Sequence, residues 1–229
     1  MSLLVVAPHP DDECLGAGGA IIRAAERGDQ VTVLTVCADL PPVYPEGVQA
    51  MVQAEATRAH EVLGVTNSVF LDFPSVEVSR LPVATVNAAV LEAVEAARPT
   101  TVLLPFPDRH VDHRAVFEAV MVATRPIAAG RDIQLVAMYE TLSETFWNAP
   151  GAEALFSPNW TVDISDVIDQ KVKAYGEYHS QVSPYPGPRS LEAVRALALF
   201  RGSQAGMGFG EAYQIVRSTL PLPAPGASR

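Results

Sequence analysis

The first residues that could carry chemistry form a short run near the N-terminus. The sequence there reads His9-Pro10-Asp11-Asp12-Glu13, which places one imidazole and three carboxylates within five residues. Imidazole and carboxylate groups are good ligands for zinc and similar divalent metals, so His9 and Asp12 could turn onto one ion. Asp11 would then be placed to take a proton from a metal-activated water. A plain turn before a helix N-cap explains the same residues, so this run alone leaves the choice open.

A second polar run lies near the middle of the chain and contains His110, Asp112 and His113. With His9 and Asp12, His113 would complete a set of three protein ligands, which leaves room for a water molecule as in catalytic zinc sites. His110 lies one helical turn back, where it could protonate a leaving amine or stabilise an oxyanion. Asp112 is expected either to orient one of these imidazoles or to cap the next helix, and the sequence favours neither.

Both runs follow short apolar segments that are typical of buried parallel strands. Residues 3–7 precede the first run and residues 101–104 precede the second. In open α/β sheets, sites lie beyond the carboxyl ends of the strands, so we expect the two runs to meet at one edge of a sheet. Further strands are expected at residues 31–36, 68–71, 133–138 and 160–164, and helices at 13–27, 48–63, 83–97, 112–124, 166–179 and 190–200. This alternation predicts an α/β fold whose mostly parallel sheet carries helices on both faces, with extra helices in the C-terminal part.

Length alone allows one or two domains, the composition suits a globular protein, and we expect a single domain over residues 1–220. The chain has 229 residues, 48% hydrophobic and 18% charged, which argues against global disorder. A net charge of −10 without a Lys/Arg run disfavours nucleic acid and membrane surfaces as partners. No apolar run reaches the roughly 20 residues that span a bilayer, and no signal peptide is evident, so we expect a cytoplasmic protein. The Pro/Ala/Gly-rich segment 221–229 is expected to be a flexible tail, and a homo-oligomer stays open.

Several other residues have simpler interpretations. Cys14 and Cys37 do not form a CxxC pair and are expected to be small buried groups. His60 lies inside a helical stretch and is expected at the surface or its boundary. The glycine-rich stretch 16–19 does not match a dinucleotide-binding fingerprint, because Ile21 stands where that fingerprint needs glycine. These glycines are expected to let the first helix pack close to the sheet.

Together the two polar runs resemble the PIG-L (LmbE-like) family of zinc-dependent N-acetylglucosaminyl deacetylases. The family pattern is approximately A/P-H-P-D-D-E followed by H-x-D-H, and it stands here at residues 8–13 and 110–113. Weaker similarities extend over most of the chain, within residues 3–216. The resemblance implies a Rossmann-like α/β layer, a zinc cofactor and a small amino-sugar substrate. The residues themselves leave Fe²⁺ or Co²⁺ open as the metal.

By position, the resemblance implies that His9, Asp12 and His113 hold zinc and that Asp11 is the general base. His110 would act as general acid or oxyanion stabiliser. A water molecule activated by the metal would attack the acetamide carbonyl, and the products would be acetate and a free amine.

One departure from the family concerns the oxyanion. Some members carry a Tyr two residues before the histidine that corresponds to His110, and Asp108 occupies that place here, so Tyr139 or Arg109 is a candidate substitute. The proline-rich loop 38–47 is expected to form part of the substrate wall. The residues expected to bind the sugar are Asp108, Arg109, Tyr139, Glu140, Arg189 and Arg201. For each of the charged residues in this set, taken singly, an ordinary surface or inter-helix ion pair is the simpler explanation.

Two rival functions stay open on the sequence. One is an amidase of the same chemistry that acts on another acylamide, such as a thiol conjugate. The other is a catalytically inactive sugar-binding homologue, against which the intact set of His and Asp residues argues. Acetate release from a panel of N-acetylated sugars, with Asp11→Ala as the control, would distinguish these functions.

Overall fold

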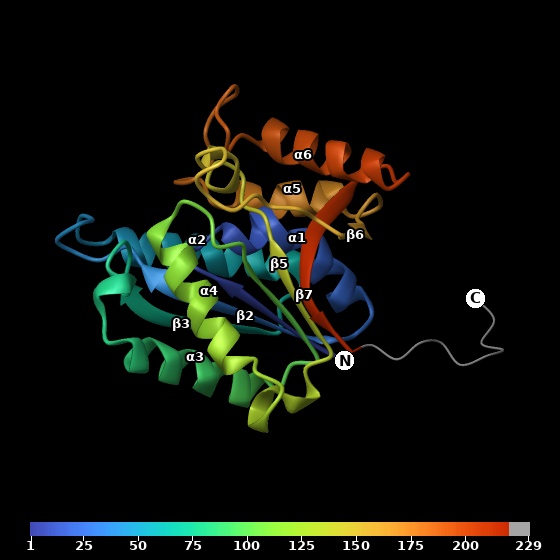
Figure 1. Cartoon of the computed structure of the whole chain (residues 1–229). Helices are drawn as coiled ribbons and strands as arrows, with labels where there is room; N and C mark the ends of the chain where they lie inside the picture. Colours follow the sequence, from blue (N-terminus) through green and yellow to red (C-terminus); the bar gives the residue numbers. More distant parts are fainter. Residues whose placement is uncertain (220–229) are drawn as a thin grey trace.

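A seven-stranded sheet forms the centre of the protein, with the strand order β3-β2-β1-β4-β5-β7-β6 (Figure 1). The computed structural model describes residues 1–219, so the tail expected at residues 221–229 lies outside the described residues. Neighbouring strands from β3 to β5 are parallel, and β7 is antiparallel to both β5 and β6. The strands are β1 (Ser2–Ala7), β2 (Gln30–Ala38), β3 (Asn67–Pro74), β4 (Thr101–Pro105), β5 (Leu135–Tyr139), β6 (Trp160–Asp163) and β7 (Gly210–Ser218).

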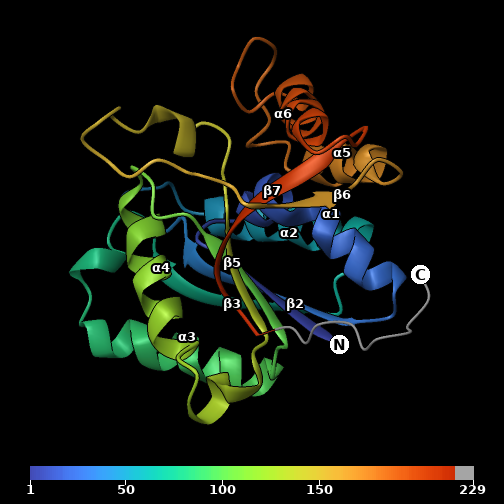
Figure 2. The same ribbon diagram turned by 45° about the vertical axis from the view of Figure 1, so that its right-hand side comes forward.

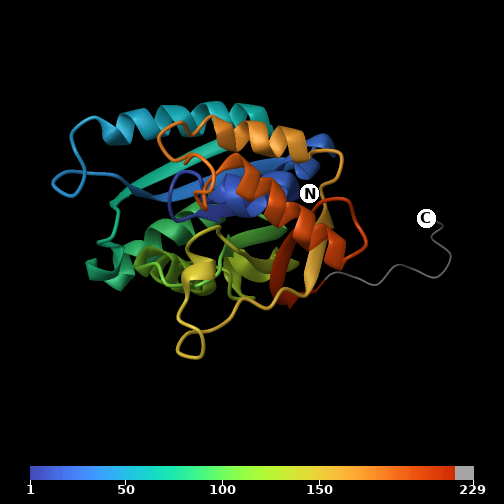
Figure 3. The ribbon, with the colours of Figure 1, turned by 90° about the horizontal axis from the view of Figure 1, so that it is seen from above.

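Helices cover both faces of this sheet (Figure 2). Helices α3 and α4 pack together on one face, and α1, α2 and α5 contact one another on the other. Viewed from above, α2, α5 and α6 lie side by side in that order (Figure 3). The helices are α1 (Asp12–Glu26), α2 (Val48–Leu63), α3 (Val83–Ala97), α4 (Val111–Ala123), α5 (Ile168–Gly176) and α6 (Leu191–Gln204), with short 3₁₀ turns at Val78–Arg80, Ala128–Asp132 and Thr145–Trp147.

The sheet separates two apolar cores. Side chains of a strand alternate between its two faces, and β1 shows this directly. Leu3 and Val5 join the core beneath α1, α2 and α5, whereas Leu4 and Val6 join the core beneath α3 and α4. The expected α/β fold with a mostly parallel sheet and helices on both faces is therefore confirmed. No helix among residues 1–219 is long and apolar enough to cross a membrane.

Glycines bring α1 close to the sheet, as expected. A Cβ atom at Gly16 would lie 2.1 Å from Tyr139 Cδ2, and one at Gly19 would lie 2.4 Å from Ile164 Cγ2. Such distances are far below van der Waals contact, so only glycine allows this packing. The loop that precedes α1 is thereby held at the carboxyl end of β1.

Strand β7 was not among the expected elements. It lies between β5 and β6 and makes the C-terminal part of the sheet antiparallel. Its sequence carries polar residues on both faces, including Glu211, Gln214 and Arg217, so it lacks the apolar run or alternation that indicates a strand. Tertiary contacts, rather than local pattern, place this segment in the sheet.

Candidate active site

The two polar runs meet at the carboxyl end of adjacent strands. Strands β1 and β4 pair in parallel, so the loops that follow them emerge side by side. His9 Nδ1 and His113 Nε2 each lie 3.4 Å from Asp12 Oδ2. The structure thus brings together the three side chains that the sequence analysis assigned to a metal.

Two buried polar atoms of this group indicate a missing partner. His113 Nε2 and Asp12 Oδ1 make no hydrogen bond within the described part of the chain, although both atoms are buried. Buried polar atoms are normally satisfied, because leaving them unpaired is costly. The rings of His9, His110 and His113 also offer nitrogen atoms within 4.8 Å of one another. The donor set and its unpaired atoms therefore fit a divalent cation.

Buried carboxylates hold the outer nitrogen atoms of both imidazoles. Asp112 Oδ2 lies 3.0 Å from His9 Nε2 and also accepts the Val76 N–H at 2.7 Å. Asp108 Oδ2 lies 3.0 Å from His113 Nδ1 and is 1% exposed. Of the two roles expected for Asp112, its position fits the one in which it orients an imidazole, that of His9. The expectation that Asp108 binds sugar is corrected, because its carboxyl group is enclosed behind His113.

The helix cap of α4 comes from another residue. His110 is the N-cap, and its Nδ1 accepts the N–H of Asp112 at 3.2 Å. The ring centroid of His110 lies 4.6 Å from that of His9 and 5.0 Å from that of His113. Burial, followed by the charges of these two neighbours, lowers the pKa of His110 to about 4. The ring is therefore neutral near pH 7 in this arrangement.

Asp11 lies beside the cluster of His9, Asp12 and His113, and its side chain is buried. It is 1% exposed, and its Oδ2 accepts from Arg189 Nη1 at 3.2 Å. Burial raises the pKa of Asp11 to about 8 against the opposing charge of Arg189. A carboxyl group whose pKa lies near neutrality is suited to proton transfer.

A polar pocket of about 170 Å³ opens onto Asp11 and two of the histidines. Of the residues expected to bind sugar, Arg189 lines it. The loop 38–47 contributes two side chains to the wall of this pocket, and its contact with substrate stays a prediction. The lining residues are His9, Pro10, Asp11, Asp39, Tyr44, His110, Glu144, Gln181 and Arg189. Asp39, Tyr44, Glu144 and Gln181 carry no motif, so sequence reasoning missed them as individual residues.

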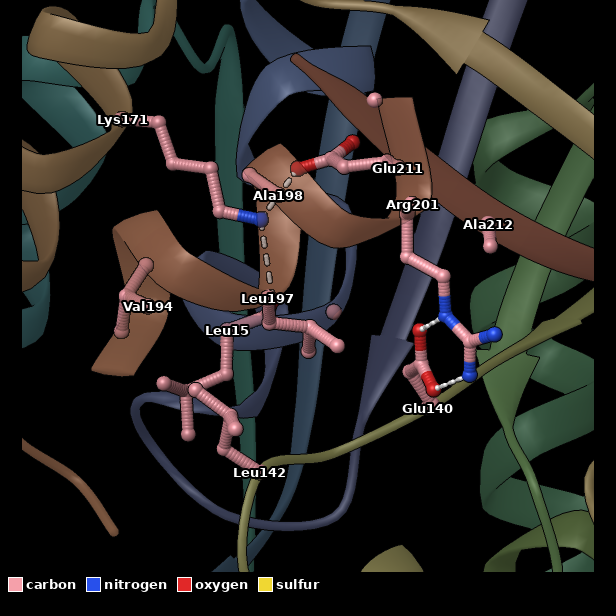
Figure 4. A pocket seen from close by; sticks show the side chains of 12 residues that line it. Leu15, Glu140, Leu142, Lys171, Val194, Leu197, Ala198, Arg201, Glu211 and Ala212 are labelled. Atoms are coloured by element: carbon pink, nitrogen blue, oxygen red, sulfur yellow. Dashed lines mark hydrogen bonds and ion pairs between the residues drawn. The ribbon is translucent and has the colours of Figure 1, made fainter. Parts of the chain in front are cut away.

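Three residues expected to bind sugar lie elsewhere. Tyr139 is 0% exposed, and its hydroxyl donates to the Val6 carbonyl at 2.8 Å, so it supports the sheet. Arg201 donates from Nε to Glu140 at 2.7 Å and from Nη2 at 2.5 Å, beside a separate small pocket (Figure 4). Tyr139, Glu140 and Arg201 therefore make structural contacts away from the pocket at Asp11, and sugar binding by them stays an untested prediction.

Arg109 lies at the margin of the site. Its Nη1 donates to Glu144 Oε2 at 3.4 Å, and its side chain is 47% exposed. His60 differs from its expectation more strongly, because it is 3% exposed and its Nε2 lies 3.6 Å from Glu13 Oε1. The position of His60 in the sequence of α2 does not indicate that it is buried. The apolar pattern of this helix gives no sign of the polar contact between His60 and Glu13.

Comparison with known proteins decides the family. The family model described as PIG-L, GlcNAc-PI de-N-acetylase, matches residues 4–124, more than half of the 229 residues. The chain belongs to the PIG-L family. The resemblance seen in the two polar runs is thereby confirmed, and both runs lie inside the matched region.

Relatives of this PIG-L protein match nearly its whole length. Diacetylchitobiose deacetylase of Thermococcus kodakarensis is 30% identical over 93% of this chain and 82% of its own length. The 2'-N-acetylparomamine deacetylase of Streptomyces fradiae is 29% identical over 99% of this chain and 91% of its own length. The crystal structure of a conserved protein from Thermus thermophilus is 28% identical, with a TM-score of 0.74 over 99% of this chain and 98% of that one.

Proposed function

We propose that this PIG-L protein is a metal-dependent hydrolase that removes the acetyl group of an N-acetylated amino sugar and releases acetate and a free amine. The observation that carries the proposal is the convergence of His9, Asp12 and His113 beside the buried carboxyl group of Asp11. The names of the relatives support the substrate class, because diacetylchitobiose and 2'-N-acetylparomamine are both N-acetylated amino sugars.

Three side chains would hold the cation. His9 presents Nδ1, His113 presents Nε2, and Asp12 presents its carboxylate between them. We propose zinc, because two imidazoles and one carboxylate form a common catalytic zinc site with an open position, although the set also suits Fe²⁺ or Co²⁺. When bound, such a cation lowers the pKa of a water molecule and polarises the acetamide carbonyl.

Asp11 is the proposed general base. Its carboxyl group lines the pocket next to the metal-binding residues, and Arg189 holds its Oδ2 at 3.2 Å. From this position Asp11 accepts a proton from the attacking water and later delivers it to the leaving amine. Arg189 therefore restricts the orientation of the Asp11 carboxyl group, in addition to lining the pocket.

His110 is the proposed hydrogen-bond donor to the oxyanion that forms from the acetamide carbonyl. Because its Nδ1 accepts the N–H of Asp112, the ring proton of the neutral tautomer is assigned to Nε2. The His110 ring lines the pocket. A fixed N–H donor directed at the position where negative charge develops stabilises that charge. This geometry favours the oxyanion role over that of a protonated general acid.

Polar side chains around the pocket would bind the sugar hydroxyl groups. Asp39 and Tyr44 come from the loop after β2, and Glu144 and Gln181 come from segments after β5 and α5. Arg109 would act on the sugar through Glu144, to which it donates. These residues offer hydrogen-bond donors and acceptors of the kind that polyhydroxylated ligands require.

Acetate release tests the proposed function. Metal-loaded protein is incubated with N,N'-diacetylchitobiose, an N-acetylated aminoglycoside and an N-acetylated thiol conjugate, and free acetate is measured. We expect release from at least one sugar and a loss of at least about a hundredfold in Asp11→Asn. Release from the thiol conjugate alone would indicate an amidase of other acylamides. No release from any compound, despite bound metal, would contradict the proposal and point to a sugar-binding protein.

A further inference from the structure

The backbone of Asp11 adopts a conformation that L residues rarely hold. Its φ is 115° and its ψ is −29°, whereas the regions open to residues other than glycine lie mainly at negative φ. A strained residue persists where surrounding contacts hold it, and such residues gather at functional sites. Asp11 directly precedes α1. The contacts that hold its peptide group therefore help to set where its carboxyl group points, together with Arg189, which donates to that group.

The peptide N–H of Asp11 donates to a buried carboxylate. Its acceptor is Glu13 Oε2 at 3.2 Å, and no other acceptor for this N–H exists among residues 1–219. Glu13 lies in the first turn of α1 and is 0% exposed. Because its carboxylate is shielded from water, the orientation of Glu13 depends on the protein groups around it.

Two other elements hold Glu13 from the opposite side. Tyr178, just beyond α5, donates its hydroxyl to Glu13 Oε1 at 2.5 Å and is 0% exposed. His60 of α2 places Nε2 3.6 Å from the same oxygen, and its Nδ1 lies 2.6 Å from Ser68 Oγ. The carboxylate is thus fixed where α1, α2 and the segment after α5 meet. One oxygen faces this core, and the other faces the strained peptide.

We propose that Glu13, held in place by Tyr178, is a positioning residue that keeps Asp11 in its left-handed conformation and so aims the carboxyl group of the base. The inference rests on the proposed function, because it concerns the base of that reaction. Neither Glu13 nor Tyr178 lines the pocket, so both act through Asp11 and not on the substrate. A hydrogen bond to a charged acceptor is stronger than one to a neutral acceptor. Removal of the tyrosine hydroxyl frees the carboxylate to turn away from the peptide.

Strand β7 provides a matched control. Tyr213 is also 0% exposed, and its hydroxyl donates to a buried glutamate, Glu211, at 2.7 Å. Glu211 accepts the peptide N–H groups of Gly19 and Ala20 in the middle of α1 rather than that of Asp11. Tyr178→Phe and Tyr213→Phe therefore each remove a hydrogen bond from a tyrosine hydroxyl to a buried glutamate. Only Tyr178→Phe affects the glutamate that accepts the Asp11 N–H.

Steady-state kinetics of the metal-loaded protein test the proposal on a sugar that the wild type deacetylates. Because small displacements of a catalytic group are costly, we expect Tyr178→Phe to lower kcat about ten- to a hundredfold with KM and bound metal nearly unchanged. Tyr213→Phe should keep kcat within about twofold, even where both variants lose similar thermal stability. Glu13→Gln, which keeps an oxygen acceptor for the Asp11 N–H, should retain more of kcat than Glu13→Ala. Equal kcat in the two tyrosine variants, or an effect confined to KM, would overturn the proposal.

Hydrogen exchange of the Asp11 amide, measured by NMR, tests the contact without any turnover. We expect faster exchange in Tyr178→Phe and Glu13→Ala than in the wild type, and unchanged exchange in Tyr213→Phe. Unchanged exchange in all variants would overturn the positioning role even in an active deacetylase. An inactive wild type would instead defeat the proposed function, while the exchange rates would still decide whether Glu13 holds Asp11.

Discussion

At the scale of single residues, two buried carboxylates determine which nitrogen atoms of His9 and His113 face Asp12 and the position proposed for the metal. Asp112 lies against His9 Nε2 and Asp108 against His113 Nδ1, each at 3.0 Å. Each imidazole therefore turns its other nitrogen toward Asp12. Carboxylate partners of this kind fix the tautomer and increase the basicity of a ligating imidazole. Asp108 thus holds the His113 ring through Nδ1, the nitrogen that faces away from Asp12.

Asp108→Asn tests this support. The amide keeps the shape of the side chain but removes the negative charge from His113 Nδ1, so we expect metal affinity to fall about ten- to a hundredfold. Competition with a chelator of known affinity measures the loss. Asp132→Asn, at an exposed site, is the control. An unchanged affinity in Asp108→Asn would show that the carboxylate is dispensable for metal binding.

Residue types and spacing predicted the proposed ligands and Asp11, because the chemistry of a metal site restricts which side chains serve. They named Asp112 as a candidate partner but not the imidazole it contacts, and they did not predict Asp108 as the partner of His113. Both contacts depend on how the loops 8–11 and 106–110 turn. Tyr178 and His60 were missed for a related reason. Both reach Glu13 from elements distant in sequence, and nothing local to either residue indicates that contact.

At the scale of elements, α1 can approach the sheet because its inner face lacks side chains at two positions. Gly16 faces the Tyr139 ring, where an added Cβ would lie 2.1 Å from Cδ2. Alanine is a better helix former than glycine by about 1 kcal/mol. Overpacking against a buried ring opposes that gain and typically costs about 1–3 kcal/mol. The net change in the free energy of unfolding on replacing Gly16 by alanine therefore shows which of these two effects is larger in α1.

We expect Gly16→Ala to lower the free energy of unfolding by about 1–2 kcal/mol, because Tyr139 cannot move out of the core. Gly176→Ala is the matched control, since nothing lies within 4 Å of a Cβ at that position of α5. It should leave stability unchanged or raise it. Urea unfolding measures both variants. Equal effects at the two glycines would show that the contact with Tyr139 does not limit packing.

A buried ion pair joins α5, β7 and α1. Lys171 Nζ donates to Glu211 Oε1 at 2.5 Å and to the Leu15 carbonyl at 3.0 Å, and both charged residues are less than 5% exposed (Figure 4). Glu211 also accepts the N–H of Gly19 in α1. These contacts place β7 in the sheet although its polar sequence does not predict a strand. The strands and helices from β1 to β5 alternate regularly, so the sequence pattern predicts them without knowledge of any long-range contact.

Lys171→Met should destabilise the protein by about 3–5 kcal/mol, because it leaves the Glu211 carboxylate buried without its counter-charge. The double variant Lys171→Met/Glu211→Gln removes both charges and should recover part of this loss. Urea unfolding free energies of the wild type and the variants provide the measurement. A single variant as stable as the wild type would contradict a role for the pair in holding β7.

At the scale of the whole molecule, the site draws its residues from segments that are far apart in the sequence. Its residues come from the ends of β1 and β4, the starts of α1 and α4, and segments near residues 144 and 181–189. Farther along the sheet, where β6 pairs with β7, no residue lines this pocket. One contact there, at the end of β6, responds to pH.

Asp163 at the end of β6 is held by Ser165. The hydroxyl and the peptide N–H of Ser165 donate to Asp163 Oδ1 at 2.6 and 2.9 Å and lower the pKa of this carboxyl group. Ser165 Oγ in turn accepts the Phe209 N–H at 3.0 Å, next to the start of β7. Since the pKa is lower in the folded than in the unfolded state, the carboxylate stabilises the fold above its unfolded pKa of about 3.9. This stabilisation is lost as pH falls through the folded pKa.

The expected size of this effect is below about 1 kcal/mol, because Asp163 is exposed and solvent screens it. Urea unfolding of the wild type and Asp163→Asn should differ most at about pH 6 and converge as the pH falls below the unfolded pKa of about 3.9 and through the lower folded pKa of this carboxyl group. Asp132→Asn removes an exposed aspartate that accepts no hydrogen bond from the described residues, and it should follow the wild type across this window. A difference between the wild type and Asp163→Asn that stayed constant with pH would show that the ionised carboxylate does not stabilise this edge. The loss would then come from the changed shape of the side chain alone.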